Sequence, residues 1–84
     1  MKLSVKGLTL ASALTWGLAV WFVAIINLRW PSYGTVFLQL MSSVYPGYHP
    51  VATLGNVIVG TLYAVVDGAL SGAIFGWVYN AAVQ

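Results

Sequence analysis

The chain has 84 residues, 61% of them hydrophobic, and its three cations and one acid give a net charge of +2. A soluble domain usually has about 25% charged residues, and a chain this short buries only about 60% of the surface it exposes when unfolded. This composition excludes an ordinary soluble domain and predicts an integral membrane protein. Three dispersed cations also exclude a nucleic-acid interface. Cysteine is absent and His49 is the one histidine, so thiolate and multi-histidine metal sites are excluded.

The first expected membrane span covers about residues 7–28. These 22 residues are uncharged, and a helix needs roughly 20 apolar residues to cross the hydrocarbon core. The rival interpretation is a cleaved signal peptide with Ala11-Ser12-Ala13 as its cleavage site. The apolar run continues past that site to Leu28, which favours a retained span.

The second expected span covers about residues 51–80. It contains Asp67, the one acidic residue of the chain. If the hydrocarbon core runs from Leu54 to Trp77, Asp67 lies close to the midplane. Trp77 and Tyr79 are the residue types that anchor a helix at the membrane interface.

The connection, about residues 29–50, is rich in aromatic and helix-breaking residues. Trp30, Tyr45 and Tyr48 are expected as interfacial anchors, and residues 33–44 can form a short interfacial helix. The sequence therefore predicts a single all-α membrane domain over residues 1–84, a hairpin of two transmembrane helices. Lys2 and Lys6 outweigh Arg29, so the positive-inside rule places both termini in the cytoplasm.

Polar side chains gather on one face of the second span. Asn56, Gly60, Tyr63, Asp67 and Ser71 share this face when they are placed on a helix. Such a stripe does not face lipid, because unsatisfied polar groups there cost several kcal/mol each. Tyr63 and Ser71 lie one turn on either side of the acid, and either hydroxyl can hydrogen-bond its carboxyl group.

Small residues recur at every fourth position of the same span: Gly60, Ala64, Gly68, Gly72 and Gly76. Rows of this kind allow helix backbones to approach closely. The first span offers a matching face of Thr9, Ala13, Gly17, Val20, Ala24 and Asn27. We expect the hairpin to use part of the row and a second chain to use the rest. The alternative is that the whole row serves the hairpin.

Asp67 has three possible roles. As a neutral acid it can donate a hydrogen bond between helices. It can also mark a proton or ion path, or pair with a cation on another protein, because acids within the membrane are typical of such sites. Lys6 and Arg29 are each expected about half a membrane away from it, too far for an ion pair within the chain.

Nearly the whole chain resembles a group of small bacterial two-span proteins commonly labelled bacteriophage holins. The similarity rests on Trp16-Gly17, Ser43-Val44-Tyr45-Pro46-Gly47-Tyr48-His49-Pro50, Gly55, Gly60, Asp67-Gly68, Gly72 and Trp77-Val78-Tyr79-Asn80. The resemblance implies assembly into membrane lesions that release a lytic enzyme. Holins typically have a charged C-terminal tail, which is not seen after Asn80. The layout also resembles the proton-carrying ring subunit of rotary ATP synthases, although the long aromatic connection and the position of the glycine row differ.

The sequence therefore predicts a small oligomeric protein of holin-like type in the bacterial inner membrane. It has no catalytic motif, so we expect no enzymatic activity, cofactor or metal. The expected partners are the lipid bilayer and either further copies of the chain or a larger membrane complex. The alternatives are a non-catalytic accessory subunit of such a complex and an ion or proton carrier that uses Asp67.

Overall fold

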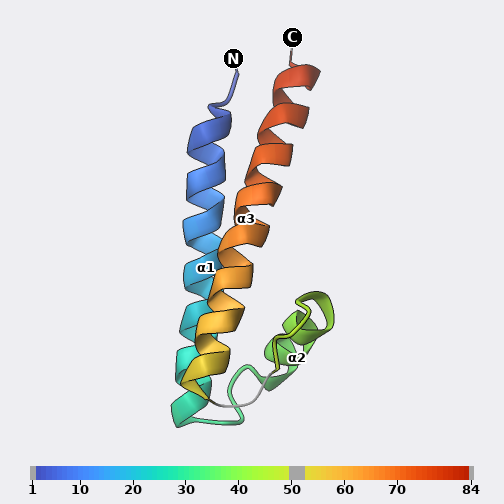
Figure 1. Ribbon diagram of the computed structural model, residues 1–84. Helices are drawn as coiled ribbons and strands as arrows, with labels where there is room; N and C mark the ends of the chain where they lie inside the picture. Colours follow the sequence, from blue (N-terminus) through green and yellow to red (C-terminus); the bar gives the residue numbers. More distant parts are fainter. Residues whose placement is uncertain (1, 50–52, 84) are drawn as a thin grey trace.

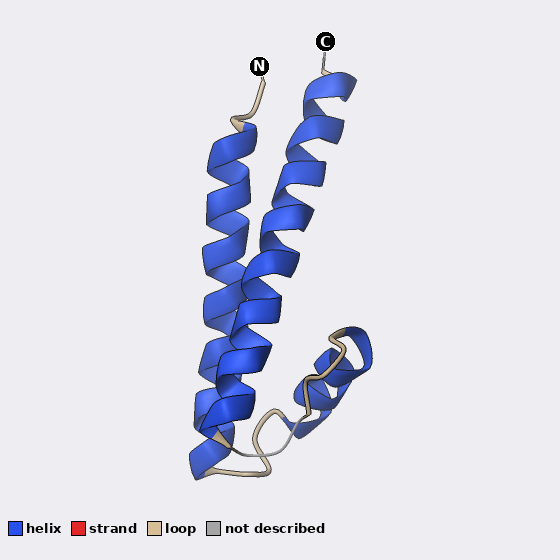
Figure 2. Ribbon diagram, viewed as in Figure 1, coloured by secondary structure: helices blue, strands red, loops and turns tan. Residues whose placement is uncertain are grey.

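The computed structural model describes residues 2–49 and 53–83, which form three helices. These are α1 (Val5–Arg29), α2 (Thr35–Val44) and α3 (Leu54–Ala82). No strand occurs among the described residues, and Figure 2 shows helices joined by short loops. The expected start of the second span at residue 51, and Pro50 before it, lie outside the described residues.

Side-chain caps begin both long helices. The Ser4 hydroxyl accepts a hydrogen bond from the Gly7 amide at 3.0 Å, and the Thr53 hydroxyl accepts one from the Asn56 amide at 3.2 Å. Each cap satisfies an amide that has no partner within its helix. Gly34 precedes α2 with φ at 67°, a left-handed conformation that favours glycine and turns the chain into this helix.

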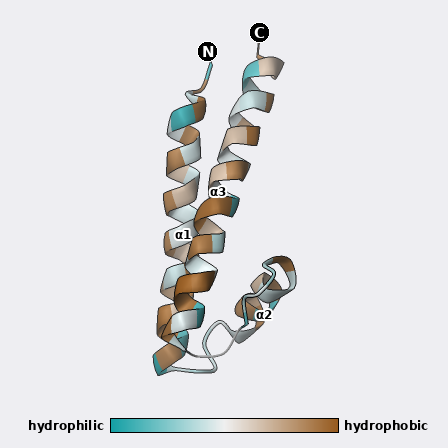
Figure 3. Cartoon of the chain, in the orientation of Figure 1, coloured by the Kyte–Doolittle hydropathy of each residue, from teal (hydrophilic) through white to brown (hydrophobic). Residues whose placement is uncertain are grey.

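α1 and α3 lie side by side, and both chain termini are at the same end of the molecule (Figure 1). The helices have 25 and 29 residues, or about 37 and 43 Å at the α-helical rise. Both are long and apolar enough to cross a membrane. Figure 3 shows them mostly white to brown, with strong teal near the ends and part-way along α3.

The face of α1 toward α3 consists of small residues. Its buried residues are Ala13, Gly17, Val20, Ala24 and Asn27. The spacing of small and polar residues predicts this face, and these five positions are buried in the structure. Thr9, the sixth, is half-buried, and its hydroxyl donates to the Val5 carbonyl at 2.7 Å.

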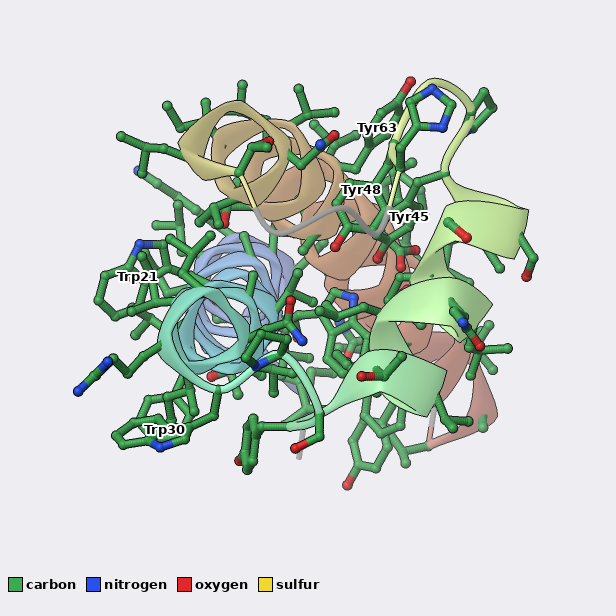
Figure 4. All side chains as sticks on the ribbon, turned by 90° about the horizontal axis from the view of Figure 1, so that it is seen from below. Trp21, Trp30, Tyr45, Tyr48 and Tyr63 are labelled. Atoms are coloured by element: carbon green, nitrogen blue, oxygen red, sulfur yellow. The ribbon has the colours of Figure 1, made fainter. Side chains whose placement is uncertain are left out.

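α2 folds back against the two long helices, and Figure 4 shows it lying to one side of them. Leu38 and Met41 are buried on its inner face, in the same cluster as Val20 and Ala24 of α1. Phe37 meets the ring of Trp16 edge to face, with centroids 6.0 Å apart. The prediction of a short helix in the connection is therefore correct, and this helix packs on the pair of long helices.

Two asparagines fasten the ends of the helix pair. Near the loop, the buried amide of Asn27 donates to the carbonyls of Pro31 and Tyr33 at 3.0 and 2.8 Å. At the other end, the Asn80 side chain accepts from the Leu3 amide at 2.7 Å and donates to the Leu3 carbonyl at 2.9 Å. Asn27 thus fixes the connection to the end of α1, and Asn80 joins α3 to the segment before α1.

Candidate functional site around Asp67

A chain of hydrogen bonds ends at Asp67, near the middle of α3. The Tyr45 hydroxyl, just after α2, donates to Asp67 Oδ2 at 2.9 Å. Trp16 Nε1 of α1 donates to the Tyr45 hydroxyl at 2.8 Å. The acid therefore joins all three helical elements, because each contributes a group to this network.

The donor to Asp67 differs from the one expected. The Tyr63 hydroxyl donates to the Pro46 carbonyl, and its ring stacks on Tyr45 with centroids 5.3 Å apart. Figure 4 shows Tyr45, Tyr48 and Tyr63 together between α2 and α3. Local helical spacing placed Tyr63 beside the acid, but Tyr45 reaches it from a segment 22 residues away in sequence.

Two other members of the predicted stripe lie apart from this network. Asn56 is in the first turn of α3, where its side-chain nitrogen Nδ2 also donates to the Thr53 hydroxyl, at 2.9 Å. It belongs to the helix cap and not to the acid. Ser71 lies one turn beyond Asp67 and, with it, lines the cleft that is described below.

The pairing of the helices sets the depth of Asp67. A Cβ atom on Gly68 would lie 2.9 Å from the Ser12 carbonyl carbon and 3.0 Å from Ala13 Cα, so this part of α3 faces those residues of α1. Along α1, that level is about 10 Å from Lys6 and about 24 Å from Arg29. From the sequence we expect the two cations to be equally distant from Asp67. Along α1 they are not, and the level of Asp67 lies nearer the end that carries the termini.

A cleft of about 530 Å³ adjoins the carboxyl group. It lies between α1 and α3 and is lined by Ala11, Ser12, Thr15, Trp16, Asp67, Gly68 and Ser71. Thr15 and Ser71 are exposed, so the cleft is open at the surface. Four of its seven lining side chains carry a hydroxyl or carboxyl group, although most of its exposed lining is apolar.

Burial keeps Tyr45 in its donor form. Desolvation raises the pKa of its phenol above the usual value of 10.0, and the hydrogen bond to Asp67 acts in the same direction. The hydrogen bond from Trp16 has the opposite effect on the pKa. The Tyr45 hydroxyl therefore stays protonated at neutral pH and can donate to the acid.

The glycine row is used inside the chain along its whole length. Gly60, Ala64, Gly68, Gly72 and Gly76 are all buried. Gly68 and Gly72 approach the carbonyl oxygens of Ser12 and Leu8, while Gly60 lies against the ring of Tyr48. The expectation that part of the row stays open for a second chain is therefore wrong. The row winds around α3, and the connection returns to cover the part that α1 does not reach.

The predicted interfacial anchors divide into two groups. Trp30 and Trp77 are exposed at opposite ends, and Tyr79 stacks on Phe75 with centroids 6.5 Å apart. Tyr45 and Tyr48 differ from the expectation, because they are only 4% and 3% exposed. Their rings pack against α3 and so fasten the connection to it.

The described residues offer no metal centre. Within residues 2–49 and 53–83, no group of three or more histidine, aspartate or glutamate side chains is close enough to hold an ion. His49 is exposed after the turn that follows α2. Asp67 is the one carboxyl side chain at the site.

Comparison of the chain with protein-family models, with curated proteins and with solved structures gave no match in any of the three. A function therefore has to be inferred from the chemistry and placement of the groups around Asp67.

Proposed function

We propose that this chain is a non-catalytic integral membrane protein that assembles with further copies of itself into a holin-like pore or membrane assembly. α1 and α3 each cross the bilayer once and together form a hairpin, with both termini on the cytoplasmic side of a bacterial inner membrane. One observation carries the proposal: Asp67 and the hydroxyl side chains of Ser12, Thr15 and Ser71 line one cleft that is open at the surface.

An open polar cleft is costly in hydrocarbon, where each unsatisfied group costs several kcal/mol. The one hydrogen bond that the Asp67 carboxyl group accepts from the described residues comes from Tyr45. Ser12, Thr15 and Ser71 add three hydroxyl groups to the same opening. Water or polar groups of another chain must cover this cleft, and copies arranged around a shared interior satisfy all of these groups together.

The remaining surface is suited to lipid. Exposed side chains along α1 include Leu10, Leu14 and Leu18, and those along α3 include Leu62, Leu70 and Ile74. The small-residue row is already buried within the chain. Copies therefore associate through the polar face and leave these leucine-rich faces to the acyl chains.

The second candidate is an accessory subunit of a larger membrane complex. Asp67 is about 10 Å in depth from Lys6, and Arg29 is still farther away. Among the described residues, no cationic side chain shares its level, so a lysine or arginine of a partner helix would complete an ion pair there. A carrier of ions or protons through Asp67 is the third candidate, because the same carboxyl group can bind either.

The first test is the composition of the native particle. The protein is extracted gently from its own membrane, and the mass and the chains of the particle are determined. Many copies of this chain alone support self-assembly. A particle dominated by larger proteins contradicts it and supports the accessory role.

Vesicle leakage then tests the cleft itself. The purified chain should release a trapped dye, and Asp67→Asn and Ser71→Ala should reduce the release. Ser43→Ala is the matched control, because the Ser43 hydroxyl donates to the Leu40 carbonyl of its own helix at 2.6 Å. Equal leakage by all variants would rule out a role for the cleft. Proton uptake that needs Asp67 without dye release would support the carrier.

A further inference from the structure

We infer that the connection between the long helices is a re-entrant element: α2 and the turn after it enter the bilayer beside α1 and α3, and the outer face of α2 contacts lipid acyl chains. This inference rests on the proposed membrane insertion, but not on the proposed assembly or on the cleft.

The depth of Tyr45 is the first observation. Arg29 and Trp30 are exposed at the loop end of α1, with the guanidinium 5.7 Å from the indole centroid, and such a pair belongs at the headgroup level. Trp16, which bonds the Tyr45 hydroxyl, lies about 20 Å along α1 from Arg29. The hydrocarbon core is about 30 Å thick. The side chains of Tyr45 and Trp16 together cover only part of that 20 Å, so the backbone of Tyr45 lies inside the core.

Two backbone carbonyls of the turn after α2 have hydrogen-bond partners within the chain. Non-helical backbone is tolerated at membrane depth only where protein or water satisfies its polar groups. The Tyr45 carbonyl accepts from the Tyr48 amide at 3.1 Å, and the Pro46 carbonyl accepts from the Tyr63 hydroxyl. Proline has no amide hydrogen to satisfy. Tyr63 thus has a clear role, since it caps a carbonyl that would otherwise face lipid.

The outer face of α2 is the third observation. Val36, Leu40 and Val44 lie one turn apart and are 80%, 57% and 59% exposed. The hydroxyls beside this stripe are satisfied locally, since Ser42 donates to the Gln39 carbonyl at 2.7 Å and Ser43 donates within the same helix. A stripe of exposed aliphatic residues on a helix held at this depth is suited to acyl chains and not to water.

The absence of cysteine makes the test direct. A nitroxide is attached to Val44→Cys, and the labelled protein is placed in vesicles of phosphatidylcholine and phosphatidylglycerol. Relaxation by oxygen, which concentrates in lipid, is compared with relaxation by a water-soluble nickel chelate. Ala19→Cys, exposed on α1 at about 15 Å from Arg29, is the lipid control. Ser32→Cys, exposed before α2, is the surface control.

We expect the oxygen-to-nickel ratio at Val44 to match that at Ala19 and to exceed that at Ser32 several-fold. Adding Tyr45→Phe should lower the ratio at Val44 but not at Ala19, because the bond to Asp67 holds the turn at its depth. A ratio at Val44 equal to that at Ser32, with Ala19 still in lipid, overturns the re-entrant element alone. Nickel access at Ala19 would instead contradict membrane insertion, and with it the proposed function.

Discussion

Adding one methyl group at Gly68 should separate the long helices. The new Cβ atom would lie 2.9 Å from the Ser12 carbonyl carbon and 3.0 Å from Ala13 Cα, whereas ordinary contact begins at 3.4 Å. The Ser12 carbonyl oxygen would lie closer still. Backbone atoms cannot rotate away as a side chain can, so α1 itself must move. A gap of about 0.5–1 Å already removes a quarter to a half of the dispersion attraction of the contacts it opens.

Gly55→Ala provides the matched control. It is the same substitution in the same helix, but nothing lies within 4 Å of its new Cβ atom. Overpacking typically costs about 1–3 kcal/mol, while alanine favours a helix over glycine by up to about 1 kcal/mol at both sites. We therefore expect Gly68→Ala to be less stable than Gly55→Ala by about 1–3 kcal/mol.

The assay is unfolding of the purified chain in mild detergent by added dodecyl sulfate, followed by tryptophan fluorescence. Gly68→Val should be less stable still, because it adds two further methyl groups at the same backbone contact. If the unfolding free energies of Gly68→Ala and Gly55→Ala lie within about 0.5 kcal/mol of each other, they refute this reasoning. The close approach of the two backbones would then contribute nothing to stability.

Three further predictions concern the contacts at the two ends and in the connection. Gly60→Ala should destabilise the chain by about 1–2 kcal/mol, because its Cβ would lie 2.8 Å from the Tyr48 ring. Tyr48→Ala should remove this penalty in a double-mutant cycle. Additive effects of the two substitutions would contradict the prediction. Asn80→Leu loses the two hydrogen bonds to Leu3, of about 1 kcal/mol each, and should speed amide exchange near the N terminus. Unchanged exchange would show that these bonds do not order this end. The contribution of Tyr45 to the unfolding free energy should be fully present below pH 10.0 and be lost as pH rises through the raised pKa of this residue, because the folded chain holds this proton more tightly than the unfolded chain does. Tyr45→Phe should remove the part of the fall that Tyr45 contributes and leave the part due to Tyr48, whose pKa burial also raises. An unchanged profile in a pH series would contradict this assignment.

The helices and their facing surfaces could be predicted because they depend on local pattern. Uncharged runs bounded by cations and prolines fix where a long apolar helix can lie. Small residues at intervals of three and four fix which face approaches a neighbour, and Ala13, Gly17 and Ala24 lie where that rule places them. In both cases the information is contained within a few helical turns.

The site could not be predicted in the same way, because its key contact is between distant segments. Helical spacing offers Tyr63 and Ser71 as partners for Asp67, and both are neighbours in sequence. The observed donor, Tyr45, belongs to a segment whose position depends on how α2 packs on the other two helices. The same return of the chain places Tyr48 on Gly60, which closes the part of the row expected to remain open.

The close approach of α3 to the backbone of α1 also bears on how this protein can diverge. At Gly68 and Gly72 the neighbouring surface is largely the main chain at Ser12 and Leu8, which every amino acid supplies. Evolution is thus free to exchange most outward side chains for other apolar ones without disturbing the interface. This architecture therefore requires small residues at fixed intervals along α3 more than it requires a particular sequence.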